Sequence, residues 1–203
     1  MKKRDIYLTQ LVKYKDKPLI KVITGIRRCG KSALLSMYEE HLRNCGVPSA
    51  HIIRMNFESF EFAAITDYKD LYTYINSRIK DPMAKYYLLL DEVQQVRSWE
   101  KVINSVFVDS NVDIYITGSN AYLLSSELST LLSGRYIEIK MLPLSFKEYL
   151  DFTSLDIKFD KNIAFKEYLE FGGLPTVVEL RDHPETIAQF LNGIYSTVIM
   201  KDV

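Results

Sequence analysis

The chain has 203 residues, of which 47% are hydrophobic, and its 26 acidic side chains balance its 26 basic ones. This composition excludes a disordered chain, and the length suits one α/β domain with room for a small subdomain. Balanced charge gives no overall basic surface for nucleic acid, and with no membrane-length apolar run or apolar signal core we expect a cytoplasmic protein without a membrane partner.

Short strands alternate with helices along the first two thirds of the chain, after a leading helix at about residues 6–14. The predicted strands, which are short and apolar, cover residues 19–24, 51–57, 86–91, 112–117 and 135–140. The predicted helices between them, which carry apolar residues at helical spacing, cover residues 32–44, 67–79, 98–109 and 120–132. Alternation of this kind predicts a three-layer α/β fold, in which a five-stranded, mostly parallel sheet has helices on both faces.

The character of the sequence changes after Pro143, because from there on only helical patterns occur. Ser145 and Glu148 have the spacing of a capping box, in which each side chain caps a main-chain N–H of the other residue. We therefore predict an α/β core over residues 1–142 and a small helical subdomain over residues 143–203.

Residues 25–32 read Gly-Ile-Arg-Arg-Cys-Gly-Lys-Ser and fit the phosphate-binding loop pattern G-x-x-x-x-G-K-[ST]. The loop lies between a predicted strand and a predicted helix, which is the context that the pattern requires. Its glycines let main-chain N–H groups turn toward phosphate oxygens, and the start of the helix adds partial positive charge. Lys31 can reach the β- and γ-phosphates, and the Ser32 hydroxyl can bind Mg²⁺. A P-loop NTPase fold that binds a nucleoside triphosphate is therefore predicted.

The residues in and beside this loop that we expect to contact nucleotide are Gly25, Arg28, Cys29, Gly30, Lys31, Ser32 and Ala33. We expect the side chains of Arg27 and Arg28 to point outward into solvent. Cys29 and Cys45 are the two cysteines, and a disulfide at Cys29 would strain the loop. This indicates a reducing compartment and a packing role for Cys29.

Two adjacent carboxylates, Asp91 and Glu92, follow the apolar strand predicted over residues 86–91. In a parallel sheet the end of this strand shares the carboxyl edge with the phosphate loop. Asp91 is predicted to accept the waters of a Mg²⁺ held by Ser32, and Glu92 to orient and deprotonate the attacking water. Two acids after a strand are otherwise typical of a solvated turn, and here the preceding phosphate loop favours the functional interpretation.

The strand predicted over residues 112–117 ends in small polar residues at the same edge of the sheet. Thr117, Ser119 and Asn120 are candidates for a group that senses the γ-phosphate or the attacking water. Asn120 also fits the cap of the following helix, and the two roles are compatible.

Arg135 comes after that helix and has two interpretations of equal weight. It fits an arginine finger that acts on the γ-phosphate bound by a neighbouring subunit, which implies a homo-oligomer. It also fits an exposed arginine at the start of a strand.

The order of these motifs resembles that of AAA+-type ATPases, with residues 25–32 as the Walker A motif and Asp91-Glu92 as the Walker B motif. The run from Pro143 to Leu150, with Gly172 to Pro175 downstream, resembles a large prokaryotic family of AAA-domain ATPases. The Gly-Leu-Pro at the end of the second run is similar to the glycine-x-proline motif of STAND-class NTPases. That resemblance implies that Pro175 lies against the nucleotide. Members of the prokaryotic family usually continue into a C-terminal domain, so an N-terminal ATPase module of a longer protein is implied.

Motifs and resemblance together predict an AAA+/STAND-like module that binds ATP and hydrolyses it with Mg²⁺. The residues assigned to catalysis are Glu92, Lys31, Asn120 and Arg135, and those assigned to the metal are Ser32 and Asp91. The alternative is a slow nucleotide-gated switch that releases a protein or DNA partner, and steady-state turnover distinguishes the two. A small-molecule kinase is a third interpretation, which requires an acceptor pocket and does not need Glu92 beside Asp91. The sequence identifies no protein or nucleic-acid partner.

Overall fold

The computed structural model describes residues 4–118, 130–153 and 161–201. At its centre lies a five-stranded sheet whose strand pairs are all parallel. The strands are β1 (Ile20–Thr24), β2 (Ile52–Asn56), β3 (Tyr86–Asp91), β4 (Val112–Thr117) and β5 (Tyr136–Lys140), in the order β2-β3-β4-β1-β5. The predicted number and direction of the strands are confirmed, and their ends lie within one residue of the prediction.

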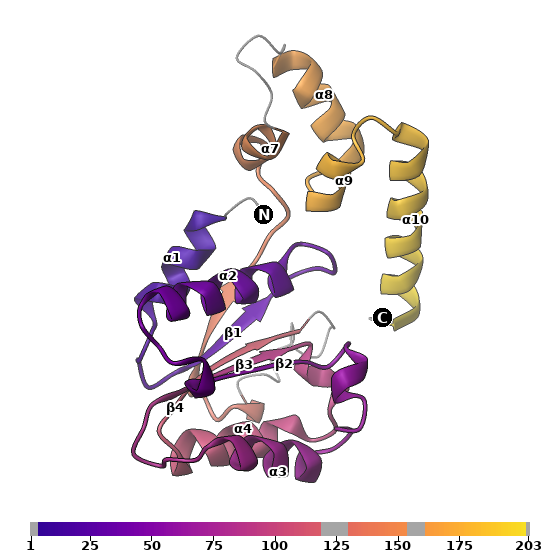
Figure 1. Cartoon of the computed structure of the whole chain (residues 1–203). Coiled ribbons are helices and arrows are strands. Elements are labelled where there is room, and N and C mark those ends of the chain that lie inside the picture. Colours follow the sequence, from indigo (N-terminus) through magenta and orange to yellow (C-terminus); the bar gives the residue numbers. More distant parts are fainter. Residues whose placement is uncertain (1–3, 119–129, 154–160, 202–203) are drawn as a thin grey trace.

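Helices cover both faces of the sheet, which confirms the three-layer arrangement (Figure 1). The helices on one face are α1 (Asp5–Lys13) and α2 (Lys31–Asn44), and those on the other are α3 (Tyr68–Arg78) and α4 (Trp99–Asp109). Short 3-10 turns in the loops are η1 (Ser49–His51), η2 (Phe60–Phe62) and η3 (Val93–Gln95). No helix in the described ranges is long and apolar enough to cross a membrane.

The strand sequences explain why both faces are covered. Successive side chains of a strand point to opposite faces, and in β1 Val22 packs toward α3 and α4 while Ile23 packs toward α1 and α2. Both side chains are fully buried, and Trp99 of α4 is buried with them. Burial on both faces is the reason that the strands read as continuous apolar runs.

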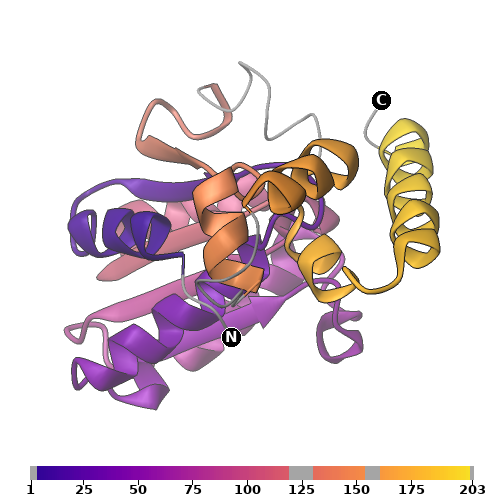
Figure 2. The same ribbon diagram turned by 90° about the horizontal axis from the view of Figure 1, so that it is seen from above.

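After β5 the described chain is helical, with α7 (Phe146–Thr153), α8 (Lys161–Phe171), α9 (Pro175–Glu179) and α10 (Pro184–Lys201). In Figure 1, α7, α8 and α9 lie beyond α1 and α2, and α10 runs back along one side of the molecule toward the level of the sheet; Figure 2 shows α10 at that side. The predicted capping box is confirmed: the Glu148 N–H donates to Ser145 Oγ at 3.3 Å, and the Ser145 N–H donates to the Glu148 carboxylate at 2.9 Å. The helix predicted over residues 120–132 falls largely outside the described residues.

The helical part has an apolar core of its own. Its buried members, contributed by the turn before α9, by α9 and by α10, are Leu174, Val177 and Ile187. Aromatic rings that join α7 to α8 through mutual contacts are those of Phe146, Tyr149, Phe165 and Tyr168. One cluster therefore joins α9 to α10, and the other joins α7 to α8.

Residues 141–144 connect the sheet to the helical part and pack against a glycine at each of their ends. The Met141 N–H donates to the last residue of β1 at 2.7 Å, and a Cβ on Gly25 would lie 2.2 Å from the Met141 carbonyl oxygen. The Leu144 N–H donates to the Gly173 oxygen at 2.6 Å, and a Cβ on Gly173 would lie 2.3 Å from the Leu144 oxygen. Gly25 also has φ +148°, which disfavours any other residue. The phosphate loop and the turn before α9 therefore both pack against the same four-residue linker.

Replacing Gly173 by alanine should push the turn before α9 away from the linker. Because the added Cβ meets a main-chain oxygen, we expect the free energy of unfolding to fall by about 1–3 kcal/mol, as overpacking usually causes, in a urea titration. Gly193→Ala is the matched control, since its Cβ meets no described atom within 4 Å. In α10 that change should be neutral or stabilise by about 0.5–1 kcal/mol. Equal effects of the two substitutions would contradict the close packing of the linker.

Candidate functional site

Three strands bring their carboxyl ends to one edge of the sheet. β1 leads into the phosphate loop, β3 ends at Asp91 and β4 ends at Thr117. The register pairs Ile23 with Thr117 and Leu90 with Ile116, so Asp91 and Thr117 leave neighbouring strands at the same level. The structure thus brings together the phosphate loop and the acidic pair that the sequence predicts for this site.

The phosphate loop folds around the ammonium group of Lys31, whose side chain is buried. Lys31 Nζ donates to the carbonyl oxygens of Gly25 at 3.0 Å and Ile26 at 3.3 Å. It also lies 3.8 Å from a carboxylate oxygen of Glu92. Gly30, with φ +103°, directly precedes α2, so this charge lies at a helix start. A fixed positive charge at a helix N-terminus is suited to an anion.

The other residues of the loop differ in exposure. Arg28 is exposed, whereas Arg27 is half-buried and pairs at 3.1 Å with Glu58, which is itself partly exposed. Cys29 is fully buried, and this burial raises the pKa of its thiol. A thiol of raised pKa stays protonated near neutral pH, which fits the packing role expected of it.

Asp91 is fully buried, and two side chains bind its carboxylate. Thr117 Oγ1 donates to Oδ1 at 2.5 Å, and Arg54 Nη2 donates to Oδ2 at 3.1 Å. Arg54 was not among the residues that the sequence predicted for the site. It lies on β2, two strand positions before the level of Asp91, and only the strand register reveals that the two side chains meet.

Among the candidates for a sensing group, the structure describes Thr117. Its hydroxyl, besides donating to Asp91, accepts the main-chain N–H of Glu92 at 3.0 Å. Both hydrogen bonds of the Thr117 hydroxyl therefore go to the acidic pair, and the residue is fully buried. Ser119 and Asn120 lie outside the described residues.

Glu92 has a left-handed backbone, with φ +55°. A residue other than glycine is held in this region only when its surroundings over-determine it, and such residues cluster at functional sites. Gln94 Nε2 donates to Glu92 Oε2 at 2.5 Å, and the opposite oxygen faces Lys31. The carboxylate, although buried, lines a cavity at the phosphate loop.

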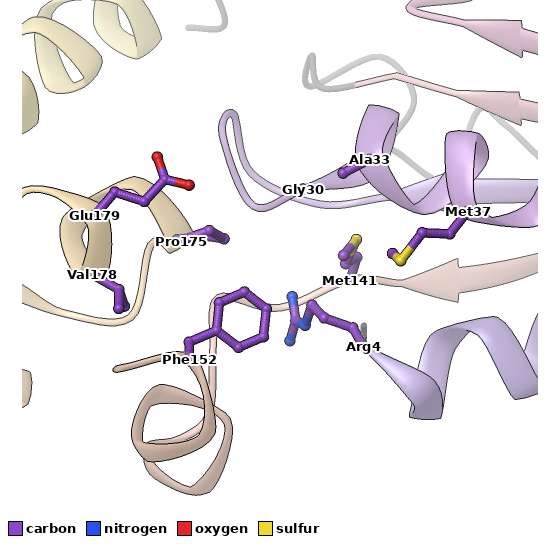
Figure 3. Close-up of a pocket in the computed structure, with 9 residues that line it drawn as sticks. All are labelled: Arg4, Gly30, Ala33, Met37, Met141, Phe152, Pro175, Val178 and Glu179. Atoms are coloured by element: carbon purple, nitrogen blue, oxygen red, sulfur yellow. The ribbon is translucent and has the colours of Figure 1, made fainter. Parts of the chain in front are cut away.

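Two adjoining cavities lie between the phosphate loop and the helical part. The first, of about 410 Å³, is mainly apolar, and the residues that line it are Arg4, Gly30, Ala33, Met37, Met141, Phe152, Pro175, Val178 and Glu179 (Figure 3). The second, of about 340 Å³, is polar and is lined by Arg27, Arg28, Gly30, Lys31, Ser32, Ala33, Glu58, Glu92, Pro175 and Thr176. Gly30, Ala33 and Pro175 line both cavities, so the two cavities lie next to each other.

Arg4 holds the junction of the loop, the linker and the helical part, and sequence reasoning missed it. Its guanidinium donates to the Cys29 oxygen at 3.3 Å, the Leu142 oxygen at 2.7 Å and the Pro143 oxygen at 3.3 Å. It also forms two hydrogen bonds to the Glu148 carboxylate, at 2.8 and 3.0 Å. Arg4 is 4% exposed although it lies near the start of the chain, where a basic residue reads as a surface residue.

Ser32 and Asp91 offer donors that fit Mg²⁺. Arg54 Nη2 lies 3.1 Å from the Asp91 carboxylate and 3.5 Å from the Ser32 main-chain oxygen, so these two residues are neighbours. In the part of the chain that the structure describes, no three His, Cys, Asp or Glu residues gather into a metal-enclosing group. One hydroxyl and one carboxylate, completed by water and phosphate oxygens, is a donor set that Mg²⁺ takes in nucleotide sites.

Arg135 lies at the opposite edge of the sheet. Its main-chain oxygen accepts the N–H of Ile20, the first residue of β1, at 2.8 Å, and its side chain is exposed. The length of β1, roughly 13 Å for four residue steps, separates it from the phosphate loop. Arg135 therefore does not belong to the two cavities of its own chain.

Arg4→Met keeps the size of the side chain but leaves buried carbonyl oxygens and Glu148 without their donor. We expect the free energy of unfolding to fall by about 2–3 kcal/mol in a urea titration, the range for hydrogen bonds to charged groups. Arg43→Met, which breaks an exposed pair with Glu39 four residues earlier, should cost about 0.3–0.5 kcal/mol.

The contribution of Arg4 to the free energy of unfolding should also depend on pH. Burial acts to raise the pKa of Glu148, but hydrogen bonds from Arg4 and Ser145 outweigh it and lower that pKa. The pair therefore stabilises the fold above the unfolded pKa of the carboxyl group, and its contribution is lost as the pH falls through the lower, folded value. The difference in the free energy of unfolding between the parent and Arg4→Met should therefore shrink in acid. A difference that stays the same in acid would contradict this role of Arg4.

Comparison with known proteins agrees with this geometry. Residues 17–150 match a family described as AAA domain. An uncharacterised protein of Haemophilus influenzae is 46% identical over 205 residues, which cover 98% of this chain and 50% of that protein. An uncharacterised protein of Methanocaldococcus jannaschii is 33% identical over 190 residues, which cover 87% of this chain and 41% of that protein. The chain thus spans half or less of the length of these curated relatives.

Solved structures share the fold at low sequence identity. DnaA from Aquifex aeolicus, bound to AMPPCP, is 16% identical with a TM-score of 0.56, and the match covers 86% of this chain and 57% of that one. A DNA polymerase III gamma subunit-related protein from Thermotoga maritima is 12% identical with a TM-score of 0.54, and the match covers 84% of this chain and 58% of that one. Since the family match spans most of the sheet and the phosphate loop, the chain belongs to the AAA-domain family of P-loop ATPases.

Proposed function

We propose that this chain binds ATP across the two adjoining cavities and hydrolyses it with Mg²⁺. One observation carries the proposal: a charged cavity at the phosphate loop adjoins an apolar cavity beneath the helical part, and the two share three lining residues. ATP has a similar division, with a polyanionic chain of phosphates at one end and, at the other, a flat aromatic base whose faces pack against apolar side chains. Volumes of about 410 and 340 Å³ lie in the range of small-molecule sites.

The charged cavity suits the triphosphate. Lys31 supplies a buried positive charge at the start of α2, where main-chain N–H groups have no partner inside the helix. Arg28 adds an exposed positive charge at the rim. The Ser32 hydroxyl and the Asp91 carboxylate would hold Mg²⁺, which neutralises charge on the phosphates when it is bound.

The apolar cavity suits the base. Met37 and Met141 come from the core, while Phe152, Pro175 and Val178 come from the helical part and face them across the cavity (Figure 3). Methionine and aromatic side chains pack well against flat rings. Because Pro175 lines both cavities, it would lie beside the sugar that joins base and phosphates. We therefore propose that residues 143–203 act as a lid on a core formed by residues 1–142.

Glu92 is the group that would take a proton from the attacking water. Its left-handed backbone turns the carboxylate into the charged cavity, and Gln94 holds one carboxylate oxygen by a 2.5 Å hydrogen bond. An oriented carboxylate beside the phosphates fits a general base.

A slow nucleotide-gated switch is the second candidate function. The observation that favours it is the engagement of both Glu92 oxygens, one with Gln94 and the other with Lys31. These contacts leave fewer lone pairs of the carboxylate for the attacking water, which would slow turnover. Steady-state turnover far below the enzyme median of ~10 s⁻¹ would identify a switch.

Lys31→Ala removes the buried charge at the phosphate loop and should abolish tight ATP binding while the fold is retained. Calorimetric titration with ATP measures the binding, and circular dichroism checks the fold. Lys101→Ala, which removes a lysine from a surface groove lined by residues of α3 and α4, should bind ATP like the parent. If Lys31→Ala binds ATP with the affinity of the parent, the proposed nucleotide site is wrong.

Glu92→Gln keeps the shape of the side chain but cannot accept a proton. ATP should bind with parent-like affinity, while phosphate release should slow by about 10²–10⁴-fold, the usual contribution of a general base. Hydrolysis within a few-fold of the parent would show that Glu92 is not the base.

We also propose that Arg135 completes the site of a neighbouring subunit. It is exposed at the amino edge of the sheet, where it reaches no phosphate of its own chain. Turnover per subunit should then rise with protein concentration, and Arg135→Ala should lower it by ~10³–10⁵ without loss of ATP affinity. Arg97→Ala, in the exposed loop before α4, is the control. If turnover per subunit changes neither with protein concentration nor in Arg135→Ala, Arg135 is an exposed surface residue without a role in catalysis.

A further inference from the structure

The Asp91 carboxylate has a cationic partner within its own chain. Arg54 Nη2 donates to it at 3.1 Å, and the carboxylate is fully buried whereas the Arg54 side chain is 21% exposed. A buried carboxylate is costly unless a positive charge or hydrogen bonds compensate it. The hydroxyl of Thr117 supplies a hydrogen bond but no charge. Among the described residues, Arg54 is the only cation that pairs with Asp91.

This cation lies where the metal would act. The Arg54 nitrogen that binds Asp91 is also 3.5 Å from the main-chain oxygen of Ser32, the second residue assigned to Mg²⁺. A divalent ion held by Ser32 and Asp91 would therefore stand close to a guanidinium. Two positive charges at such a distance repel strongly at the low polarity of a buried site.

Arg54 binds Asp91 through one of its terminal nitrogens only. Its other terminal nitrogen, Nη1, is buried and has no hydrogen-bond partner within the described residues. A buried donor without a partner is costly, and Arg–carboxylate pairs are frequently bidentate, with two parallel N–H···O bonds. The contact is thus one-sided, and moving the guanidinium breaks one hydrogen bond to Asp91 rather than two.

Arg54 also borders a cavity on the surface beside β2. Arg54 lines a polar surface cavity of about 260 Å³ together with Glu39 and Glu61. Burial lowers the pKa of Arg54, and the charges of Asp91 and Glu39 both act against that shift, so Glu39 already attracts the guanidinium. Carboxylates therefore lie on both sides of Arg54, one at the metal site and two at the surface, where Glu39 already pairs with Arg43 and Glu61 lines the same cavity.

We propose that Arg54 is a resident counter-cation of Asp91 that Mg²⁺ must displace, and that the displaced guanidinium turns toward Glu39 and Glu61. The inference rests on the nucleotide and metal site proposed above and adds a positioning residue to it. Arg54 would compensate the charge of Asp91 and hold its carboxylate in place without metal, and it would set the Mg²⁺ concentration at which the site fills. Binding of Mg²⁺ with nucleotide would then change the charge of the cavity beside β2.

The test compares Arg54→Gln with Arg78→Gln. Arg78 lines the same surface cavity but donates to the Tyr74 hydroxyl and not to Asp91, so it is a matched loss of charge. A fluorescent, non-hydrolysable ATP analogue is titrated at pH 8 in EDTA and then over a series of Mg²⁺ concentrations. We expect the Mg²⁺ midpoint to fall by at least about fivefold in Arg54→Gln, because the competing charge is gone, and to stay unchanged in Arg78→Gln.

A second readout needs no nucleotide. Without metal, Arg54→Gln should melt at a lower temperature than Arg78→Gln. When Asp91 is also replaced by Asn, the charge that Arg54 compensates is gone, so Arg54→Gln should lower the melting temperature by less. If Arg54→Gln does not fold, Arg54→Lys takes its place, and a smaller downward shift of the Mg²⁺ midpoint is expected.

The outcomes separate this inference from the proposed function. An analogue that binds the parent while Arg54→Gln and the parent share one Mg²⁺ midpoint would overturn the competition and leave the nucleotide site standing. A parent that binds no analogue, in EDTA or in Mg²⁺, would overturn the proposed function and the competition with it. A raised midpoint in Arg54→Gln would show that Arg54 assists the metal, which also contradicts the proposal.

Discussion

The contacts of residues 141–144 decide where the two sides of the site can lie. Gly25 at the phosphate loop and Gly173 before α9 both approach this linker so closely that neither position has room for a Cβ. Arg4 adds hydrogen bonds from its guanidinium to the loop, the linker and α7. The apolar residues of the helical part therefore face the phosphate loop at a fixed separation. Two cavities that adjoin are the result of this arrangement, and the proposed function depends on it.

Compensation of buried charge is the second constraint on the site. Lys31, Asp91 and Glu92 are all buried, and each lies within reach of an opposite charge or a polar group. Charges that are already paired cost less to bury, but every new partner must replace an old one. Phosphate would compete with carbonyl oxygens for Lys31, and Mg²⁺ would compete with Arg54 for Asp91. The same exchange of partners links nucleotide binding to the position of Glu92.

Local patterns could predict much of this structure. The strands read as apolar runs because both of their faces are buried, and the phosphate loop and the acidic pair are recognisable because each motif consists of consecutive residues. Arg4 and Arg54 could not be found in this way, since their carboxylate partners lie 144 and 37 residues away. An arginine near a chain start or on an edge strand reads as a surface residue. The apolar cavity could not be predicted from the sequence either. Phe152 and Val178 line it together with Gly30 of the phosphate loop, and only the path of the linker brings these distant residues together.

The central claim is that the base of ATP lies in the apolar cavity between the core and the helical part. Photo-crosslinking with an azido-adenine analogue of ATP, followed by peptide mapping, tests it most directly. The label should fall on peptides that contain Met37, Met141, Phe152 or residues 175–179, and excess ATP should suppress it. A label that ATP does not suppress, or one confined to the surface groove lined by Tyr68 and Tyr72, would contradict the account.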